Sequence, residues 1–180
     1  MQGNKGEWSE SYAALRIIGD RKIFVADRSG AMNPNEWMNV LALMRRETRE
    51  RLVSYRYDAN DVDVVIAVNE DPVYRLPASE FVSLADRLLT EINRNKSSSF
   101  VVTDELESAL RTVQVHSLKA KSDSKSDVTL SVLDPRSGVT RSEIGFSIKS
   151  ELGQPPTLFN TATASAPIYR LHGMTAELAT

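Results

Sequence analysis

The chain has 180 residues, and its 22 Lys and Arg side chains nearly balance its 24 Asp and Glu side chains, which gives a formal net charge of −2. Hydrophobic residues make up 41% and charged residues 26% of the chain, as in a globular protein with one full-sized core. The absence of cysteine excludes disulfide bonds, a cysteine nucleophile and thiolate-bound metal sites, and two histidines are too few for a histidine-rich metal cluster.

Neither a membrane span nor a signal peptide is expected. The sequence has no run near the roughly 18 apolar residues that cross a membrane, and its N-terminal segment lacks the apolar stretch of a signal peptide. These features predict a soluble, cytoplasmic protein. The balanced charge also argues against a strongly basic, non-specific nucleic-acid binder, although a local cleft can still hold positive charge.

The first 45 residues predict two helices with a strand between them. A helix is expected over about 5–18 with Gly19 ending it, and the apolar run KIFVA predicts a strand over 22–26. Asn33 as a cap and Pro34 in the first turn predict a second helix. The apolar face expected for that helix consists of Trp37, Val40, Leu41 and Met44.

A charged segment, 45–51 (RRETRER), continues the same expected helix. Its arginines suit contacts to phosphate groups, but they are interleaved with Glu47 and Glu50. Mixed charge of this kind is typical of a solvated helix face. We therefore expect this segment to be an exposed outer turn.

The middle of the chain predicts one strand and two helices. The β-branched run VDVVIAV indicates a strand over 62–68. Apolar residues at helical spacing then predict a helix over 79–93. Thr103 is expected to cap a further helix, whose apolar residues are Leu106, Leu110 and Val113.

The last third predicts a β-hairpin, with strands near 127–134 and 144–149 joined by a turn at 134–138. A break is expected at 153–157, a strand at 167–172 and the beginning of a helix at the C-terminus. The fold class is therefore α/β or α+β, a mixed sheet flanked by helices. We expect the hairpin at the centre of the sheet, with its polar face meeting the N-terminal helix at a cleft.

The hairpin brings residues with useful chemistry together. Folding the hairpin about its turn is expected to bring Asp127 opposite residue 146 or 147, depending on a bulge. Asp127 can then lie across from Ser147 and diagonal to Lys149, and such cross-strand neighbours are roughly 5 Å and 7–8 Å apart. An aspartate that binds Mg²⁺ beside a lysine that stabilises charge is the minimum for metal-assisted phosphodiester cleavage. The alternative is an exposed Asp–Lys pair of the kind common on sheets, which contributes at most about 1 kcal/mol.

Several short segments, in this order, resemble the HpaII-type restriction endonuclease family. They are GNKGEWSE at 3–10, KSD at 125–127, GFSIKS at 145–150 with LG at 152–153, and TLFN at 157–160. The resemblance implies a PD-(D/E)xK nuclease core that cuts double-stranded DNA at CCGG with Mg²⁺. It assigns Asp127 as the metal-binding aspartate and Lys149 as the catalytic lysine.

One departure concerns the second carboxylate of the metal site. Ser147 occupies the position where most such nucleases have Glu or Asp, so the motif reads SIK. Glu7 and Glu10 share a face of the first expected helix, and Glu151 follows the hairpin. We expect Glu10 to supply the charge, so that Asp127, Glu10 and the Ile148 carbonyl hold Mg²⁺. Glu7 and Glu151 remain alternatives.

The resemblance further implies that 1–180 is a single nuclease domain, the N-terminal portion of a longer family member and so truncated at its C-terminus. Double-stranded DNA is the expected partner, and a homodimer is possible for an enzyme that reads a palindrome. Arg136, Arg141 and Arg170 are candidates for reading bases, since arginine pairs with guanine in the major groove. A catalytically silent DNA-binding or scaffold module is the alternative function.

Overall fold

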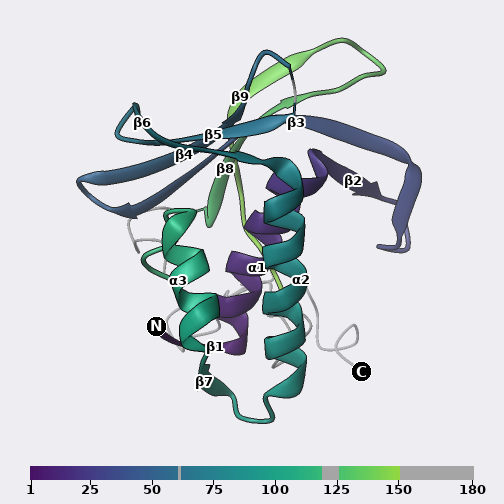
Figure 1. The fold of residues 1–180 in the computed structure, drawn as a ribbon. Helices are drawn as coiled ribbons and strands as arrows, with labels where there is room; N and C mark the ends of the chain where they lie inside the picture. The colour runs from purple at the N-terminus through teal and green to yellow at the C-terminus, as the bar shows by residue number, and fades with distance from the viewer. Residues whose placement is uncertain (61, 119–125, 151–180) are drawn as a thin grey trace, which may run out of the picture.

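The computed structural model describes residues 1–60, 62–118 and 126–150, in which three helices pack on one face of a seven-stranded sheet (Figure 1). The helices are α1 (Lys5–Asp20), α2 (Ala78–Arg94) and α3 (Asp104–Thr112). The sheet contains β2 (Lys22–Ala26), β3 (Met32–Thr48), β4 (Arg51–Tyr57), β5 (Asp63–Val68), β6 (Asp71–Pro77), β8 (Val128–Leu133) and β9 (Thr140–Phe146). The short strands β1 (Gln2–Asn4) and β7 (Ser99–Val101) pair separately.

The strand order is β6-β5-β4-β3-β8-β9, with β2 also paired to β3. This arrangement confirms the predicted class of helices and strands around one sheet, and every strand pairing in the described residues is antiparallel. The predicted central position of the hairpin is wrong, because β9 lies at the edge. The centre is β3, whose 17 residues are long enough to pair with β2, β4 and β8.

The prediction of a helix from Asn33 through the charged segment is wrong, because these residues form β3. The Asn33 side chain accepts a hydrogen bond from the Asn35 backbone at 3.0 Å, so it supports a local turn instead of a helix. Pairing with strands on both sides outweighs the capping signal. As a consequence Arg45 and Glu47, expected to be solvated, are buried, whereas Arg46 between them is exposed.

Helix α1 is confirmed, and its N-terminus is fixed by a capping box. The Asn4 side chain accepts from the Glu7 backbone, and the Glu7 carboxylate accepts from the Asn4 backbone, both at 2.9 Å. The helix ends at Asp20, after Gly19. A Cβ atom on Gly19 would lie 2.5 Å from the Val82 side chain, so this glycine allows α1 and α2 to pack closely.

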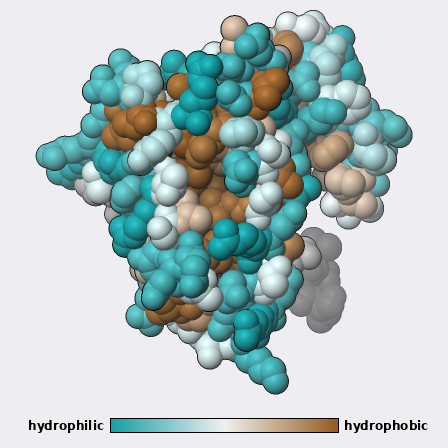
Figure 2. Space-filling model, in the orientation of Figure 1, coloured by the Kyte–Doolittle hydropathy of each residue, from teal (hydrophilic) through white to brown (hydrophobic). Residues whose placement is uncertain are grey.

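The other elements expected before residue 113 also form. Strands β2 and β5 and helix α2 lie where predicted, and Thr103 caps α3 by accepting from the Leu106 backbone. On the face shown in Figure 2, apolar side chains come to the surface between the sheet and the helices. Among the described residues no helix is long and apolar enough to cross a membrane. The elements expected at 153–157, at 167–172 and at the C-terminus lie outside the described residues.

The predicted hairpin is confirmed as β8 and β9. Its turn is closed by a 2.9 Å hydrogen bond from Gly138 N to Asp134 O, and Gly138 takes the left-handed conformation that favours glycine. The apolar faces are as expected, but they point toward the helices, where Val128, Leu130 and Val132 join α1 in one core. Along β8 the polar face therefore points away from α1, contrary to the prediction of a cleft there, and α1 approaches the hairpin at its open end, where Asp127 lies.

Candidate active site

Asp127 immediately precedes β8, at the open end of the hairpin. The first pair of the hairpin is Val128 with Phe146, so Asp127 lies at residues 146 and 147, within the range predicted. Its backbone N donates to Phe146 O at 2.9 Å, and its Oδ2 accepts from Ile148 N at 2.6 Å. The carboxylate is thus held against the backbone next to Lys149, whose side chain is exposed.

A glycine lets the two sides of this site approach each other. A Cβ atom on Gly145 would lie 2.9 Å from both the Cβ and the Oγ of Ser126. Gly145 is the first residue of the GFSIKS segment, and Ser126 adjoins Asp127. A side chain at 145 would therefore push Ser126 away from β9.

Helix α1 brings Glu10 to the same place. The pKa of Glu10 is raised from 4.5 to about 7, mainly by burial and next by the negative charge of Asp127. Glu7 raises it further, whereas Arg45 and Lys149 lower it. Two carboxylates and a lysine that are far apart in the sequence therefore lie close enough to interact electrostatically.

Of the alternative acids, Glu7 already has a structural task in the capping box of α1. Its carboxylate accepts a hydrogen bond from the Asn4 backbone, so it is less available than Glu10 to bind a cation. Glu151 lies outside the described residues. Glu10 is thus the acid of α1 that interacts with both Asp127 and Lys149.

Arg45 is a member of this site that the sequence analysis missed. Its side chain is only 6% exposed and donates to Ser117 O at 2.6 Å and to Leu118 O at 2.9 Å. It also pairs with Glu47 at 3.4 Å. Period-two alternation over 43–47 was the signal for it, because a strand places Leu43, Arg45 and Glu47 on one face.

Glu47 in turn holds the loop that follows α3. Its Oε1 accepts from the backbones of His116 and Ser117 at 2.8 and 3.1 Å. Its Oε2 accepts from Arg51 at 3.1 Å, and Arg51 also donates to the Gln114 side chain. The buried positive charge near Glu10 is thereby fixed in position by a network of hydrogen bonds.

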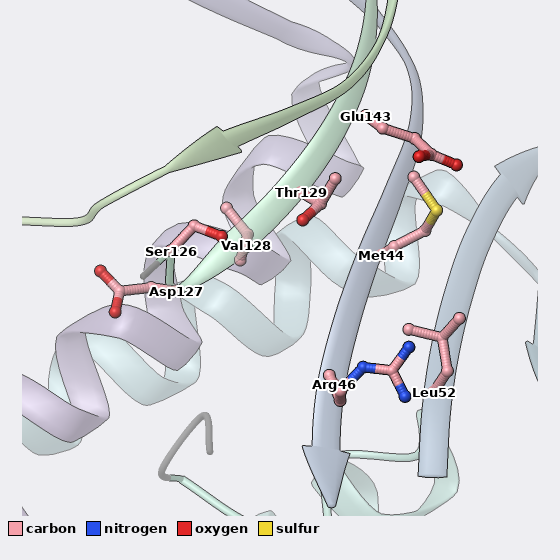
Figure 3. Close-up of a pocket in the computed structure, with 8 residues that line it drawn as sticks. All are labelled: Met44, Arg46, Leu52, Ser126, Asp127, Val128, Thr129 and Glu143. Carbon is pink, nitrogen blue, oxygen red and sulfur yellow. The ribbon is translucent and has the colours of Figure 1, made fainter. Parts of the chain in front are cut away.

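A cavity of about 200 Å³ adjoins the site on the side of the sheet away from the helices. It is lined by Met44, Arg46, Leu52, Ser126, Asp127, Val128, Thr129 and Glu143. In Figure 3 the Asp127 carboxylate turns away from Arg46 and toward α1. Asp127 therefore lies at the border between this cavity and α1.

The residues present suit a magnesium ion by chemistry. Glu10 and Asp127 offer carboxylate oxygens and Ile148 a backbone carbonyl, and Mg²⁺ usually takes one or two carboxylates and leaves its other positions to water and phosphate. A cation would also relieve the repulsion that raises the pKa of Glu10. Within the described part of the chain, no three His, Cys, Asp or Glu side chains are grouped to hold a metal.

Two of the three arginines suggested for reading bases lie at the wrong end of the hairpin. Arg136 is in the turn, where it pairs with Glu36 at 2.8 Å and with Asp134. Arg141 pairs with Val132, five residues along β8 from Asp127 and so about 17 Å away. The expectation that they lie near the site is wrong, and Arg170 is outside the described residues.

Comparison with known proteins gives the family. The model of the HpaII restriction endonuclease family matches residues 4–180. The type II restriction enzyme HpaII of Haemophilus parainfluenzae is 31% identical over 174 residues, which cover 97% of this chain and 48% of that protein. The chain thus spans about half the length of this curated relative, and no solved structure matches it. On this evidence the chain belongs to the HpaII restriction endonuclease family.

Proposed function

We propose that the chain carries the active site of a site-specific endonuclease that hydrolyses double-stranded DNA at the palindrome CCGG with Mg²⁺. One observation carries the proposal. The Asp127 carboxylate is hydrogen-bonded at 2.6 Å to the residue before Lys149, and both Asp127 and Lys149 act on the pKa of Glu10. Two acids beside a lysine are what metal-assisted phosphodiester hydrolysis requires.

Each residue has a role that follows from its place. Asp127, Glu10 and the Ile148 carbonyl would hold the divalent cation. When bound, the cation supplies a lower pKa for coordinated water and stabilises negative charge on the phosphate. Lys149 orients the attacking water and stabilises the charge on the phosphate oxygens. Water adds across one P–O bond, which leaves a phosphate monoester on one fragment and a hydroxyl on the other.

Arg45 favours the ionised form of Glu10. Its buried guanidinium lowers the pKa of Glu10 and so opposes the effects of burial and of Asp127. Because its donors are occupied by backbone carbonyls of Ser117 and Leu118, it stays in place without binding substrate. It therefore acts as a positioning residue for the carboxylates.

A plasmid digest tests the proposal. The chain, or a longer protein that carries it, should produce discrete fragments that end at CCGG in Mg²⁺ and none in EDTA. Asp127→Asn is the matched control, since it preserves size and removes one charge. Sequence-specific binding without cutting, in the longer protein as well, would support the silent DNA-binding module instead.

A palindromic target is two-fold symmetric, and two-fold symmetric dimers are the commonest way for a protein to match such symmetry. We therefore infer that two copies act together, each with one site on one strand. Sedimentation with a CCGG duplex should give two chains per duplex, and a stoichiometry of one chain would contradict this inference.

A further inference from the structure

The alternation of β3 divides its charged residues between the two faces of the sheet. Arg45 and Glu47 point into the buried network, and Arg46 between them points to the face that carries no helix in the described residues. Met44 pairs with Thr129, so the same register continued by two residues places Arg46 beside Asp127. The guanidinium of Arg46 is thus next to the residue that immediately precedes β8.

Arg46 is free to meet a ligand from this side. It is exposed, lines the cavity of about 200 Å³ and donates to Arg49 O in its own turn at 3.3 Å. Figure 3 shows its guanidinium on the cavity side of β3, while the Asp127 carboxylate lies on the other side of β8. Arg46 would therefore contact a part of the ligand next to the part that is bound at Asp127 and Glu10.

A second exposed arginine lies on the same face. Arg56 on β4 pairs with Ala42, four residues from Arg46 along β3, which corresponds to about 13 Å. Five other side chains lie around the two arginines on this face. They are Ala42, Met44, Leu52, Ser54 and Thr129. This open face, defined by these seven residues, has two cations at its ends, and the small side chains of Ala42 and Ser54 lie buried between them.

We infer that the open face binds the phosphate backbone of duplex DNA, with Arg46 on a phosphate next to the one that is cleaved and Arg56 farther along. The inference rests on the proposed function and adds to it the side from which the duplex approaches. Arginine binds phosphate through paired, charge-assisted hydrogen bonds. Such contacts fix the register of the duplex without reading its sequence. Glu143, which lines the same cavity, opposes this binding.

Salt-dependent binding tests the inference. Fluorescence anisotropy in EDTA would measure binding of the protein to a CCGG duplex and to a scrambled duplex between 50 and 200 mM salt. Arg46→Gln and Arg56→Gln should each lower the slope of log K against log salt by about 0.9 and weaken binding about five- to tenfold near 0.1 M salt. Both duplexes should be affected equally, because a phosphate contact carries no sequence information.

Matched variants make the result specific. Arg94→Gln removes the same charge from the end of α2, where the side chain is 78% exposed, and should leave slope and affinity unchanged. Arg46→Lys should keep the slope, and Glu143→Gln should strengthen binding. If wild-type protein binds DNA but Arg46→Gln and Arg56→Gln behave like Arg94→Gln, the inference is overturned while the proposed function survives. If wild-type protein binds neither duplex, both fail.

Discussion

At the scale of single residues, Glu10 is the most informative position, because its charge matters both to stability and to the proposed chemistry. Glu10→Gln keeps the size of the side chain and removes its charge. Cleavage should fall at least about a hundredfold, or ~2.7 kcal/mol of transition-state stabilisation. Single-turnover cleavage rates measure this. Glu7→Gln is the control, since Glu7 caps α1; it should lower the melting temperature and leave the cleavage rate within about threefold.

The same residue should make the metal-free protein less stable as the pH rises. The pKa of Glu10 is about 7 in the folded protein, whereas its ordinary value of 4.5 applies to the unfolded chain. The folded state therefore binds the proton more tightly. That contribution to the free energy of unfolding is fully present below pH 4.5 and is lost as the pH rises through about 7.

Urea unfolding of wild-type protein and Glu10→Gln in EDTA at pH 5 and pH 8 measures the effect. From pH 5 to pH 8 the free energy of unfolding of the variant should rise by at most about 2 kcal/mol relative to that of wild type. This figure is reduced because water reaches part of the carboxylate. If the difference in free energy of unfolding between the variant and wild type is the same at pH 5 and pH 8, Glu10 does not lie beside Asp127 as described.

Residue-level reasoning from the sequence succeeded where the period of the element was read correctly. Val128 and Phe146 lie opposite each other, next to Asp127 and Ser147, because alternation holds at the open end of the hairpin, although the register shifts between Leu130 and Val132. Arg45 was missed because a helix was assigned to its segment, and a helix does not separate neighbouring residues into buried and exposed faces.

At the scale of elements, β3 shows how tertiary pairing overrides local signals. Asn33-Pro34 is a good helix start in isolation, but β4 and β8 pair with the residues that follow, and both are remote from Asn33 in sequence. The local sign of the strand is the alternation over 43–47, which does not name the strands that pair with it. Helices α1 and α2 were predictable because their apolar spacing agrees with the way they pack.

The buried network on β3 should be expensive to break. The Glu47 side chain is 1% exposed and accepts two backbone N–H groups as well as bonds from Arg45 and Arg51. Glu47→Gln removes the carboxylate that pairs directly with the buried Arg45 guanidinium, so the free energy of unfolding should fall by about 3–5 kcal/mol. Urea titration measures this loss. Glu50→Gln, in the exposed turn, should change stability by less than about 0.5 kcal/mol.

At the scale of the whole molecule, the Arg46 guanidinium lies on the cavity side of β3, whereas the Asp127 carboxylate turns away from it and toward α1 (Figure 3). Binding and cleavage should therefore be separable. Without metal, Glu10 and Asp127 repel the phosphate that must approach them, whereas Arg46 and Arg56 attract its neighbours. Removing one of the acids should thus help the duplex to bind even as it prevents the reaction.

Asp127→Asn provides the test of this separation. Its side-chain oxygen can still accept from Ile148 N, so the hairpin should fold. In EDTA the variant should bind a CCGG duplex about two- to tenfold more tightly than wild type, because one like charge near the phosphate is gone. In Mg²⁺ wild-type protein should bind more tightly and cut, while the variant should gain less affinity and cut at least about a hundredfold more slowly. Weaker binding by the variant in EDTA would mean that Asp127 does not face the DNA.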